Sequence, residues 1–375
     1  MRVGLDITQA VKRRGRGIAH YIREVVPRLA DPSLGLDATF CIRGERWWRR
    51  GLVADMVPAA PRSWLPLSSW LTAGGLELFH SFGNHLPQIA RTPLTFTVHD
   101  FRALDRPPDR GIGGDRLRRN IERASGVLCL TEHGRARLLH HYPDFEPQRL
   151  AVVPHGVDRH RFCPQDPQLS RATALKYGLD SPFLIQLGSW FPHKNLELAI
   201  RAFALSKARS EGFRLAFVGG GATVDYANEL AELANREGVS DAIRWIEDVS
   251  GADLPRLLAA AAALLQPSRY EGFALPLLEA MAVGLPGVVA DSSCLPEVSG
   301  GVWPIAAQDD IAAFAAAIDD MALDGPKRSG AVKAGLERAA QFTWEETARR
   351  TAAFFRQVAR QEPSAGLDRT RSGGR

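Results

Sequence analysis

The sequence predicts an α/β fold made of two domains, each with a parallel β-sheet. The chain has 375 residues, enough for two domains of ordinary size with separate hydrophobic cores. Short apolar segments alternate with amphipathic segments of helical spacing, a pattern typical of parallel βαβ units. The alternation stops at a polar segment that contains prolines, then starts again at Phe183, which indicates the second domain.

The composition is that of a globular protein. Hydrophobic residues make up 45% of the chain and charged residues 24%. We find no apolar run of about eighteen residues, the length that a membrane-spanning helix needs. Met1 leads directly into a strand-like segment without the core of a signal peptide. We therefore expect a cytoplasmic protein.

The net charge of +5 is compatible with anionic ligands or an anionic membrane face. The arginines are scattered, and no helix-turn-helix, zinc-finger or RNP-like pattern occurs, so we do not expect nucleic acid as a partner. Four cysteines lie far apart without metal-ligand or redox spacing. We expect them to be reduced and buried; they are Cys41, Cys129, Cys163 and Cys294.

Six short apolar segments in the first half predict the strands of one sheet. They lie at residues 3–7, 38–42, 76–80, 94–98, 126–130 and 150–153. After the first of them, residues 18–29 have apolar side chains at helical spacing. The loop between, from Lys12 to Gly17, is basic and contains glycine, so it suits either a phosphate or a plain turn with solvated arginines.

Two other features of the first half have more than one interpretation. His99 and Asp100 end a predicted strand at its carboxyl edge, where open α/β sheets bind ligands, although an isolated histidine is often structural. Residues 47–50 and 62–71 are rich in tryptophan and arginine. They suit a packed helix with snorkelling arginines, or an edge that contacts the inner face of the plasma membrane.

The second half repeats the alternation. Predicted strands lie at residues 183–188, 215–221, 243–249, 264–266 and 287–290, and predicted helices begin near 196 and cover 310–323 and 332–342. Thr343 and Glu346 form a capping-box-like start of a last helix. The expected organisation is a first domain at 1–160, a linker at 161–180, a second domain at 181–342, a helix at 343–361 and a disordered tail at 362–375.

The segment 268–282 combines a tight turn with the start of a helix. Gly272 permits the turn, and Pro276 suits a first helical turn. The free amides and positive dipole end of such a helix suit a phosphate. Glu271 lies before the helix and Glu279 about one turn inside it, so both are candidate acceptors for sugar hydroxyls, or simply solvated glutamates. Lys194, at another strand-to-helix turn, suits a phosphate or plain solvent.

Residues 270–298 resemble the Glu-x7-Glu region of retaining glycosyltransferases of family 4. The matching residues are Tyr270-Glu271-Gly272-Phe273, Leu278-Glu279-Ala280-Met281-Ala282, Gly284-Leu285-Pro286 and Leu295-Pro296-Glu297-Val298. This resemblance implies a GT-B fold, with two Rossmann-like domains, an interdomain cleft and a C-terminal helix that crosses back to the first domain. Three positions depart from the family pattern: Ala19, His193 and Ala274.

The resemblance also implies roles. Lys194 would contact the donor diphosphate, Glu271 the transferred sugar, and Glu279 the ribose; His99 would lie beside the reacting carbon. These make His99, Glu271 and Lys194 the candidate catalytic residues. The candidate donor-binding residues are Gly17, Gly188, Ser189, His193, Lys194, Gly272, Phe273, Ala274, Leu275 and Glu279, with Arg16 as a further candidate.

The sequence has no Asp-x-Asp motif, so we expect no metal and no cofactor. The expected partners are a nucleotide-sugar donor and a glycan or lipid-linked saccharide acceptor. The resemblance favours a retaining hexosyltransferase of surface-polysaccharide assembly that moves mannose or rhamnose. An epimerase or phosphorylase on the same fold, and a catalytically silent sugar-nucleotide-binding protein, remain as alternatives.

Overall fold

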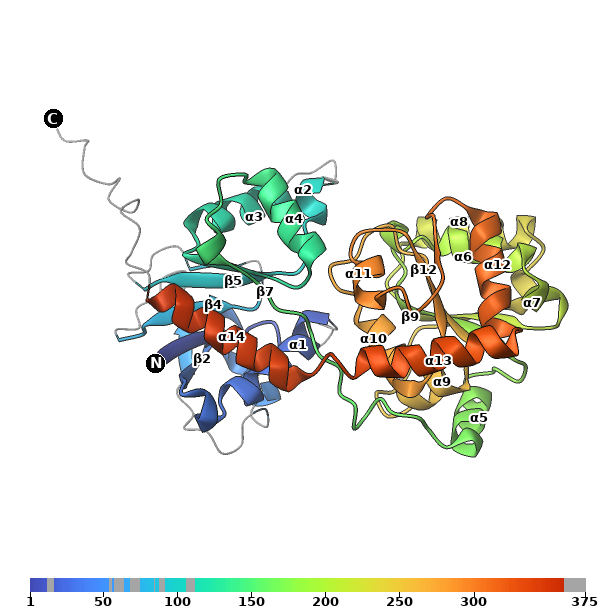
Figure 1. The fold of residues 1–375 in the computed structure, drawn as a ribbon, viewed down its shortest axis with the longest axis horizontal. Coiled ribbons are helices and arrows are strands. Elements are labelled where there is room, and N and C mark those ends of the chain that lie inside the picture. Colours follow the sequence, from blue (N-terminus) through green and yellow to red (C-terminus); the bar gives the residue numbers. More distant parts are fainter. Residues whose placement is uncertain are drawn as a thin grey trace. The chain divides into compact units, whose positions relative to one another are not determined.

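The fold is described from a computed structural model, which covers residues 1–11, 17–53, 56, 64–67, 75–83, 85–87, 92–105 and 112–360. The chain divides into two compact units. Unit 1 consists of Met1–His155 together with the chain from Trp344 onward, and unit 2 is Gly156–Thr343. Each unit has one sheet with helices on both faces (Figure 1).

Unit 1 contains a seven-stranded sheet in the order β3-β2-β1-β4-β5-β6-β7, in which every neighbouring pair is parallel. The sequence predicted six of these strands and missed β3. The order reverses between β1 and β4, the arrangement of a doubly wound, Rossmann-like sheet. The strands are β1 (Arg2–Asp6), β2 (Asp37–Arg43), β3 (Trp64–Leu67), β4 (Leu78–Ser81), β5 (Leu94–Val98), β6 (Gly126–Cys129) and β7 (Leu150–Val152).

The last helix of the chain is part of unit 1. Helix α14 packs against α1, and its buried face includes Trp344, Phe354 and Phe355 (Figure 1). The expected return of this helix to the first unit is thereby confirmed. The helices of unit 1 are α1 (Gly17–Leu29), η1 (Pro32–Leu34), η2 (Gly44–Val53), α2 (Arg102–Asp105), α3 (Ile112–Arg123), α4 (Glu132–His141), η3 (Pro147–Arg149) and α14 (Trp344–Ala359).

Unit 2 contains a six-stranded sheet in the order β10-β9-β8-β11-β12-β13, again with parallel neighbours. Its order reverses between β8 and β11, so the two units share one topology. The strands are β8 (Phe183–Ser189), β9 (Arg214–Gly220), β10 (Ile243–Ile246), β11 (Ala263–Gln266), β12 (Gly287–Ala290) and β13 (Ile305–Ala306).

Helices cover both faces of the unit 2 sheet. Helices α6, α8 and α12 lie on one face, and α9, α10 and α13 on the other (Figure 1). The helices are α5 (Pro167–Lys176), η4 (Pro192–Lys194), α6 (Leu196–Leu205), α7 (Lys207–Ser210), α8 (Val224–Arg236), η5 (Ser240–Ala242), α9 (Leu254–Ala260), α10 (Leu275–Val283), α11 (Leu295–Ser299), α12 (Ile311–Ala322) and α13 (Gly325–Ala339).

Three expectations are corrected here. Residues 161–180, expected to be a linker, contain α5, which packs on α9 within unit 2. Helix α13 starts at Gly325, seven residues before the expected start at Val332, because the Asp324 side chain caps it by accepting from Lys327 N. All four cysteines are free, but Cys163 is partly exposed whereas the other three are buried. The tail expected at 362–375 lies outside the described residues.

Candidate functional site

The loops that follow β8 and β11 bring the predicted residues of unit 2 together. These strands are neighbours at the point where the strand order reverses. In open parallel sheets, ligands bind beyond the carboxyl ends of the strands at such a point. Lys194 lies in the short helix η4 after β8, and Glu271 lies in the loop between β11 and α10. Chain topology alone therefore places both residues beside the expected ligand position.

Lys194 and Glu271 form a close, largely buried ion pair. The Nζ atom of Lys194 lies 2.6 Å from Oε1 of Glu271, and the two side chains are only 15% and 10% exposed. Burial makes such a pair sensitive to the loss of either partner, because the other charge is then left uncompensated. The sequence predicted that both residues serve one ligand, and the structure shows them in direct contact.

Two neutral donors support the same carboxylate. Gln266 donates from Nε2 to Oε1 of Glu271 at 2.8 Å, and Ser268 donates from Oγ to Oε1 at 2.7 Å. The backbone N–H of Glu271 donates to Oγ of Ser293 at 2.9 Å. Gln266 and Ser268 are fully buried. Sequence reasoning missed these three residues; the one available signal was a polar residue, Gln266, at the end of an otherwise apolar strand.

The start of α10 has a backbone conformation that alanine rarely adopts. Ala274 precedes the helix with φ 67° and ψ 60°, in the left-handed region. This conformation costs about 1–2 kcal/mol for a residue with a Cβ atom. No side chain caps the first amides of α10, whose first residue Leu275 is partly exposed. This helix start therefore suits an anionic ligand.

Glu279 lies in the second turn of α10, with part of its surface exposed. Among the described residues, no hydrogen bond or ion pair to its carboxyl group occurs. Burial raises the pKa of Glu279 to about 7, and the positive charge of Arg161 opposes this rise. A carboxyl group that is costly to ionise and has no protein partner is a good candidate for binding ligand hydroxyls.

Close backbone packing shapes the carboxyl end of β8. Gly188 and Gly219 have φ 146° and 156°, and a Cβ atom on Gly219 would lie only 1.7 Å from the carbonyl oxygen of Gly188. Glycine is thus required at Gly219. Ser189 ends β8, and the ring of His193 stacks on Phe191 with 6.0 Å between centroids. Of the predicted donor-binding residues, Gly188 and Ser189 are thus the last two residues of β8, and His193 directly precedes Lys194 in η4.

His99 and Gly17 lie in unit 1. His99 follows β5 and donates from Nε2 to the carbonyl oxygen of Phe82 at 2.6 Å, which leaves Nδ1 as the acceptor of the neutral ring. Burial lowers the pKa of His99, against the opposing effect of the Phe82 carbonyl. The ring also lies near Tyr21 and His155. Gly17 begins α1, and no atom of the described residues lies within 4 Å of the place that a Cβ atom on it would take. Arg16 lies outside the described residues.

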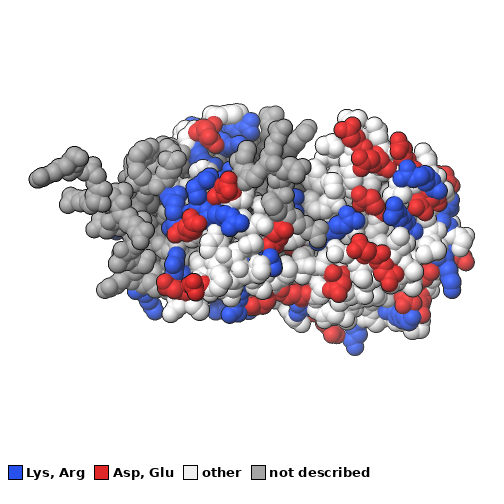
Figure 2. All heavy atoms as spheres, turned by 90° about the horizontal axis from the view of Figure 1, so that it is seen from above, with Lys and Arg blue, Asp and Glu red and all other residues white. Residues whose placement is uncertain are grey.

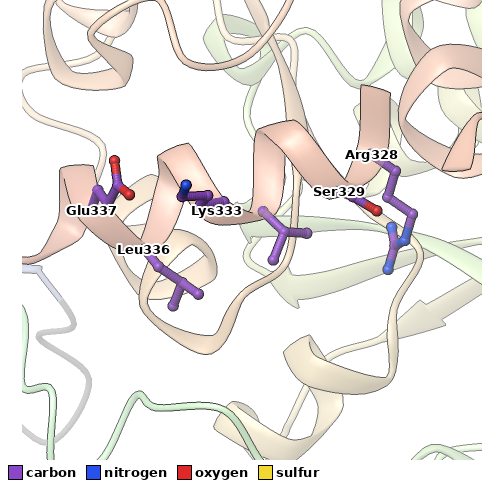
Figure 3. Close-up of a pocket in the computed structure, with 6 residues that line it drawn as sticks. Arg328, Ser329, Lys333, Leu336 and Glu337 are labelled. Atoms are coloured by element: carbon purple, nitrogen blue, oxygen red, sulfur yellow. The ribbon is translucent and has the colours of Figure 1, made fainter. Parts of the chain in front are cut away.

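Three other kinds of feature could indicate a site among the described residues: a metal cluster, a membrane-spanning helix and a groove. No group of three or more potential metal ligands occurs among them. None of the helices in this part of the chain is long and apolar enough to cross a membrane. A shallow groove runs along α13, lined by Arg328, Ser329, Val332, Lys333, Leu336 and Glu337 (Figure 3). This groove includes none of the predicted site residues.

Comparison with known sequences identifies the family. The profile of "Glycosyl transferases group 1" matches residues 173–338, and that of "Glycosyltransferase Family 4" matches residues 15–161. The D-inositol 3-phosphate glycosyltransferase of Salinispora arenicola is 30% identical over 308 residues, 73% of this chain and 67% of that protein. The chain belongs to the family 4 glycosyltransferases.

Other members of the family resemble the chain to a similar degree. O-antigen chain mannosyltransferase B of Escherichia coli is 28% identical over 282 residues, 73% of this chain and 72% of that enzyme. The D-inositol 3-phosphate glycosyltransferase of Kribbella flavida is 33% identical over 285 residues, 70% of this chain. The match spans 65% of the Kribbella protein's own length.

Solved structures of glycosyltransferases share the fold. Sucrose-phosphate synthase from Thermosynechococcus elongatus superposes with a TM-score of 0.74 at 19% identity, covering 96% of this chain and 99% of that one. HepE of Anabaena, solved with UDP-glucose, gives 0.75 at 16% identity, covering 94% and 98%. These similarities, with the two doubly wound sheets, confirm the expected GT-B fold class.

Proposed function

We propose that this chain is a retaining hexosyltransferase that moves a sugar from a nucleoside-diphosphate sugar to a hydroxyl of a glycan or lipid-linked acceptor. The observation that carries the proposal is the Lys194–Glu271 pair beside the start of α10, at the point where the strand order of unit 2 reverses. A cation and a helix start suit a diphosphate, whereas a carboxylate suits sugar hydroxyls. Mannose or rhamnose is the proposed sugar, and the similarity to the E. coli mannosyltransferase supports mannose.

In this proposal the bond between the anomeric carbon and the diphosphate breaks, and the electron pair leaves with the diphosphate. Lys194 and the first amides of α10 stabilise the negative charge that develops there. His193, and Arg16 from the loop before α1, are further candidates for this task. The acceptor oxygen then bonds to the anomeric carbon on the face that the diphosphate leaves. The acceptor proton passes to the departing phosphate or to a side chain.

The other site residues would position the donor. Glu279 accepts hydrogen bonds from the ribose, and Glu271 accepts them from the transferred sugar. His99 would act on the transferred sugar, because its unprotonated Nδ1 atom is able to accept a hydrogen bond from a sugar hydroxyl. In this scheme protein cations and amides neutralise the diphosphate, so the proposed donor complex needs no metal.

A donor screen tests the proposal. The purified chain is first mixed with GDP-, UDP- and dTDP-sugars, and a bound donor should raise the melting temperature. The stabilising donor is then supplied in labelled form with saccharide or lipid-linked acceptors. A product that retains the anomeric configuration is the expected result. An epimerised donor, a sugar 1-phosphate formed with added phosphate, or binding without any product would overturn the proposal in favour of one of the three alternatives.

We also propose that η2 contacts an anionic membrane surface, where a lipid-linked acceptor is presented. Trp48 and Leu52 are 69% and 51% exposed, although both are apolar. The guanidinium of Arg49 lies 4.3 Å from the ring of Trp48, and that of Arg50 lies 5.1 Å from the ring of Trp47. Aromatic rings beside arginines suit the boundary between anionic headgroups and acyl chains. Leu52 favours lipid over nucleic acid, since an aliphatic side chain gains nothing from a phosphate backbone.

Vesicle sedimentation tests this contact. The chain should bind vesicles that contain phosphatidylglycerol more strongly than vesicles of phosphatidylcholine alone. The double substitution Trp48→Ala with Leu52→Ser should abolish the difference. Val224→Ser is the matched control, because Val224 is an apolar residue, 77% exposed, in α8 of unit 2. The proposal would be overturned if the parent bound both vesicles equally, if the double variant kept the parent's preference for phosphatidylglycerol, or if the chain bound RNA instead.

A further inference from the structure

Three hydrogen-bond donors converge on one oxygen atom of the Glu271 carboxylate. Oε1 accepts from Lys194 at 2.6 Å, from Gln266 at 2.8 Å and from Ser268 at 2.7 Å. Oε2 accepts no hydrogen bond from any residue that the structure describes. The carboxylate is therefore held by one oxygen, and the other oxygen is available to a ligand.

The three donors differ in charge and in mobility. Lys194 is a cation on a flexible stem and is 15% exposed, whereas Gln266 and Ser268 are neutral and fully buried. A diphosphate carries more negative charge than one carboxylate, so it competes well for the lysine. Gln266 and Ser268 have no comparable alternative partner, because no part of either side chain reaches solvent.

We infer that Gln266 and Ser268 are positioning residues that hold Glu271 in place while Lys194 moves from the carboxylate to the donor diphosphate. The inference rests on the proposed function and deepens it. A buried carboxylate that loses its only partner is strongly destabilised. With two donors still on Oε1, Glu271 remains satisfied and keeps its orientation, and Oε2 stays directed to the sugar.

The surrounding contacts fix this pair of donors rigidly. Ser268 accepts a hydrogen bond from Nε2 of Gln266 at 3.1 Å, so the two side chains are also joined to each other. The backbone on either side of Ser268 is fixed as well: Asn195 donates to the carbonyl of Pro267 at 3.1 Å, and Ser292 donates to the carbonyl of Ser268. Asn195 directly follows Lys194 in a left-handed conformation. The loops that carry Lys194 and Glu271 are thus joined by contacts that do not involve the lysine ammonium.

The rival interpretation is that Gln266 and Ser268 only stabilise the fold of the loop. The two interpretations differ in which step fails. A positioning role affects recognition of the sugar and its transfer, but leaves binding of the bare nucleoside diphosphate unchanged, because that ligand does not contact Glu271. A purely structural role weakens both kinds of binding together.

The test compares Ser268→Ala and Gln266→Leu with the parent chain. Binding of the nucleoside diphosphate and of its sugar conjugate is measured by calorimetry, and transfer is measured separately. We expect the Kd of the nucleoside diphosphate to stay within about twofold of the parent's value, while the extra affinity for the sugar conjugate is lost. The value of kcat should fall about tenfold or more, because each variant loses one hydrogen bond to a charged group. Ser268→Thr, which keeps the hydroxyl, should restore kcat.

Ser299→Ala is the matched control, because Ser299 is also fully buried in unit 2 and donates only to a backbone carbonyl, that of Pro296. It should behave as the parent in all measurements. The inference is wrong if Ser268→Ala retains the parental kcat and sugar affinity, if it weakens diphosphate binding as much as sugar binding, or if Ser268→Thr fails to restore turnover. A parent chain that binds the sugar conjugate but never transfers it refutes the proposed function alone, since the binding comparison still tests the positioning role.

Discussion

The two units share a sheet topology but place different chemical groups beyond the ends of their strands. In unit 1 they include a cluster of neutral rings, those of His99, His155 and Tyr21, whose centroids lie 4.3–6.1 Å apart. In unit 2 they are Lys194, Glu271 and Glu279. Burial lowers the pKa of the histidines and raises that of Glu279. The shared fold thus determines where a site can form, and the residues after each strand determine which ligand charge it accepts.

The strongest test of this comparison is removal of a charged group from unit 2. Lys194→Ala or Glu271→Ala should lower turnover by about a hundredfold or more, because each removes a positioned stabilising group. Steady-state kinetics with the donor from the screen provide the measurement. Lys327→Ala is the matched control, since that lysine has a similar ion pair, 2.7 Å from Asp320, on an exposed surface. Parental turnover in the site variants would show that the assigned roles are wrong.

A smaller effect is expected from the neutral site of unit 1. His99→Ala should lower kcat about fivefold, because one hydrogen bond to the reacting sugar, worth about 1 kcal/mol, is lost. The affinity for the nucleoside diphosphate should not change, because His99 is not among the groups proposed to bind the diphosphate. If calorimetry showed diphosphate binding to fail in His99→Ala, the proposed division of tasks between the units would be incorrect.

The buried His80 predicts how unit 1 responds to acid. His80 is hydrogen-bonded to Thr95 and Thr97, and burial lowers its pKa to about 3. The pKa of a histidine in the unfolded chain is 6.5, so the neutral His80 contributes fully to the free energy of unfolding above pH 6.5. This contribution is lost as the pH falls from 6.5 toward 3. The loss should reach about 1 kcal/mol near pH 5.5.

His80→Gln should reduce this loss, because glutamine keeps hydrogen-bonding groups and takes up no proton. Urea denaturation of the parent and the variant at several pH values measures the difference. An identical acid response in the two chains would show that His80 does not control it.

Glu279 gives the opposite pH response, in unit 2. Its pKa is about 7 in the folded chain and 4.5 in the unfolded chain. The contribution of Glu279 to the free energy of unfolding is therefore fully present below pH 4.5 and is lost as the pH rises through about 7. Glu279→Gln removes the cost of ionisation, about 3 kcal/mol at pH 8 for a shift of this size, so its melting temperature at pH 8 should exceed that of the parent by about 5 °C or more, with little difference near pH 4. A difference that is equal at both pH values would contradict this assignment. The same variant should lose affinity for the nucleoside diphosphate at pH 8.

Much of this architecture could be predicted from the sequence, because strands buried on both faces read as short apolar runs. The missed strand β3 contains Pro66, which normally argues against a strand. It is tolerated because β3 is the edge of its sheet. Helix α5 was missed for a related reason: Pro167 suggested a linker, but it follows Asp166, whose side chain caps the helix by accepting from two backbone amides.

The candidate site could be predicted only in part. Glu271, Glu279 and Lys194 stood out because they are charged residues at strand-to-helix turns. Gln266 and Ser268 did not, because nothing in a linear sequence shows that two neutral side chains share one carboxylate oxygen. The left-handed conformation of Ala274 could not be predicted either, because alanine normally adopts a negative φ and glycine is the usual residue in the left-handed region.

The net charge of the chain was the least useful feature for predicting its ligand. The net charge of +5 suggests a basic surface, yet basic and acidic side chains are interspersed on the face of unit 2 seen in Figure 2. The groups that matter for the proposed chemistry are few and mostly buried. Total charge therefore says little about the ligand of this chain.

The position of α14 has a consequence for biosynthesis. Phe355 of this helix packs against His80, and a Cβ atom on Gly126 would collide with Phe354 and Val358, so the helix covers apolar surface that the first 155 residues leave exposed. During translation, the continuous unit 2 leaves the ribosome complete before that surface can be covered. The half of the molecule that is made first is therefore the half that finishes folding last, and its exposed apolar surface is where a chaperone would bind the growing chain.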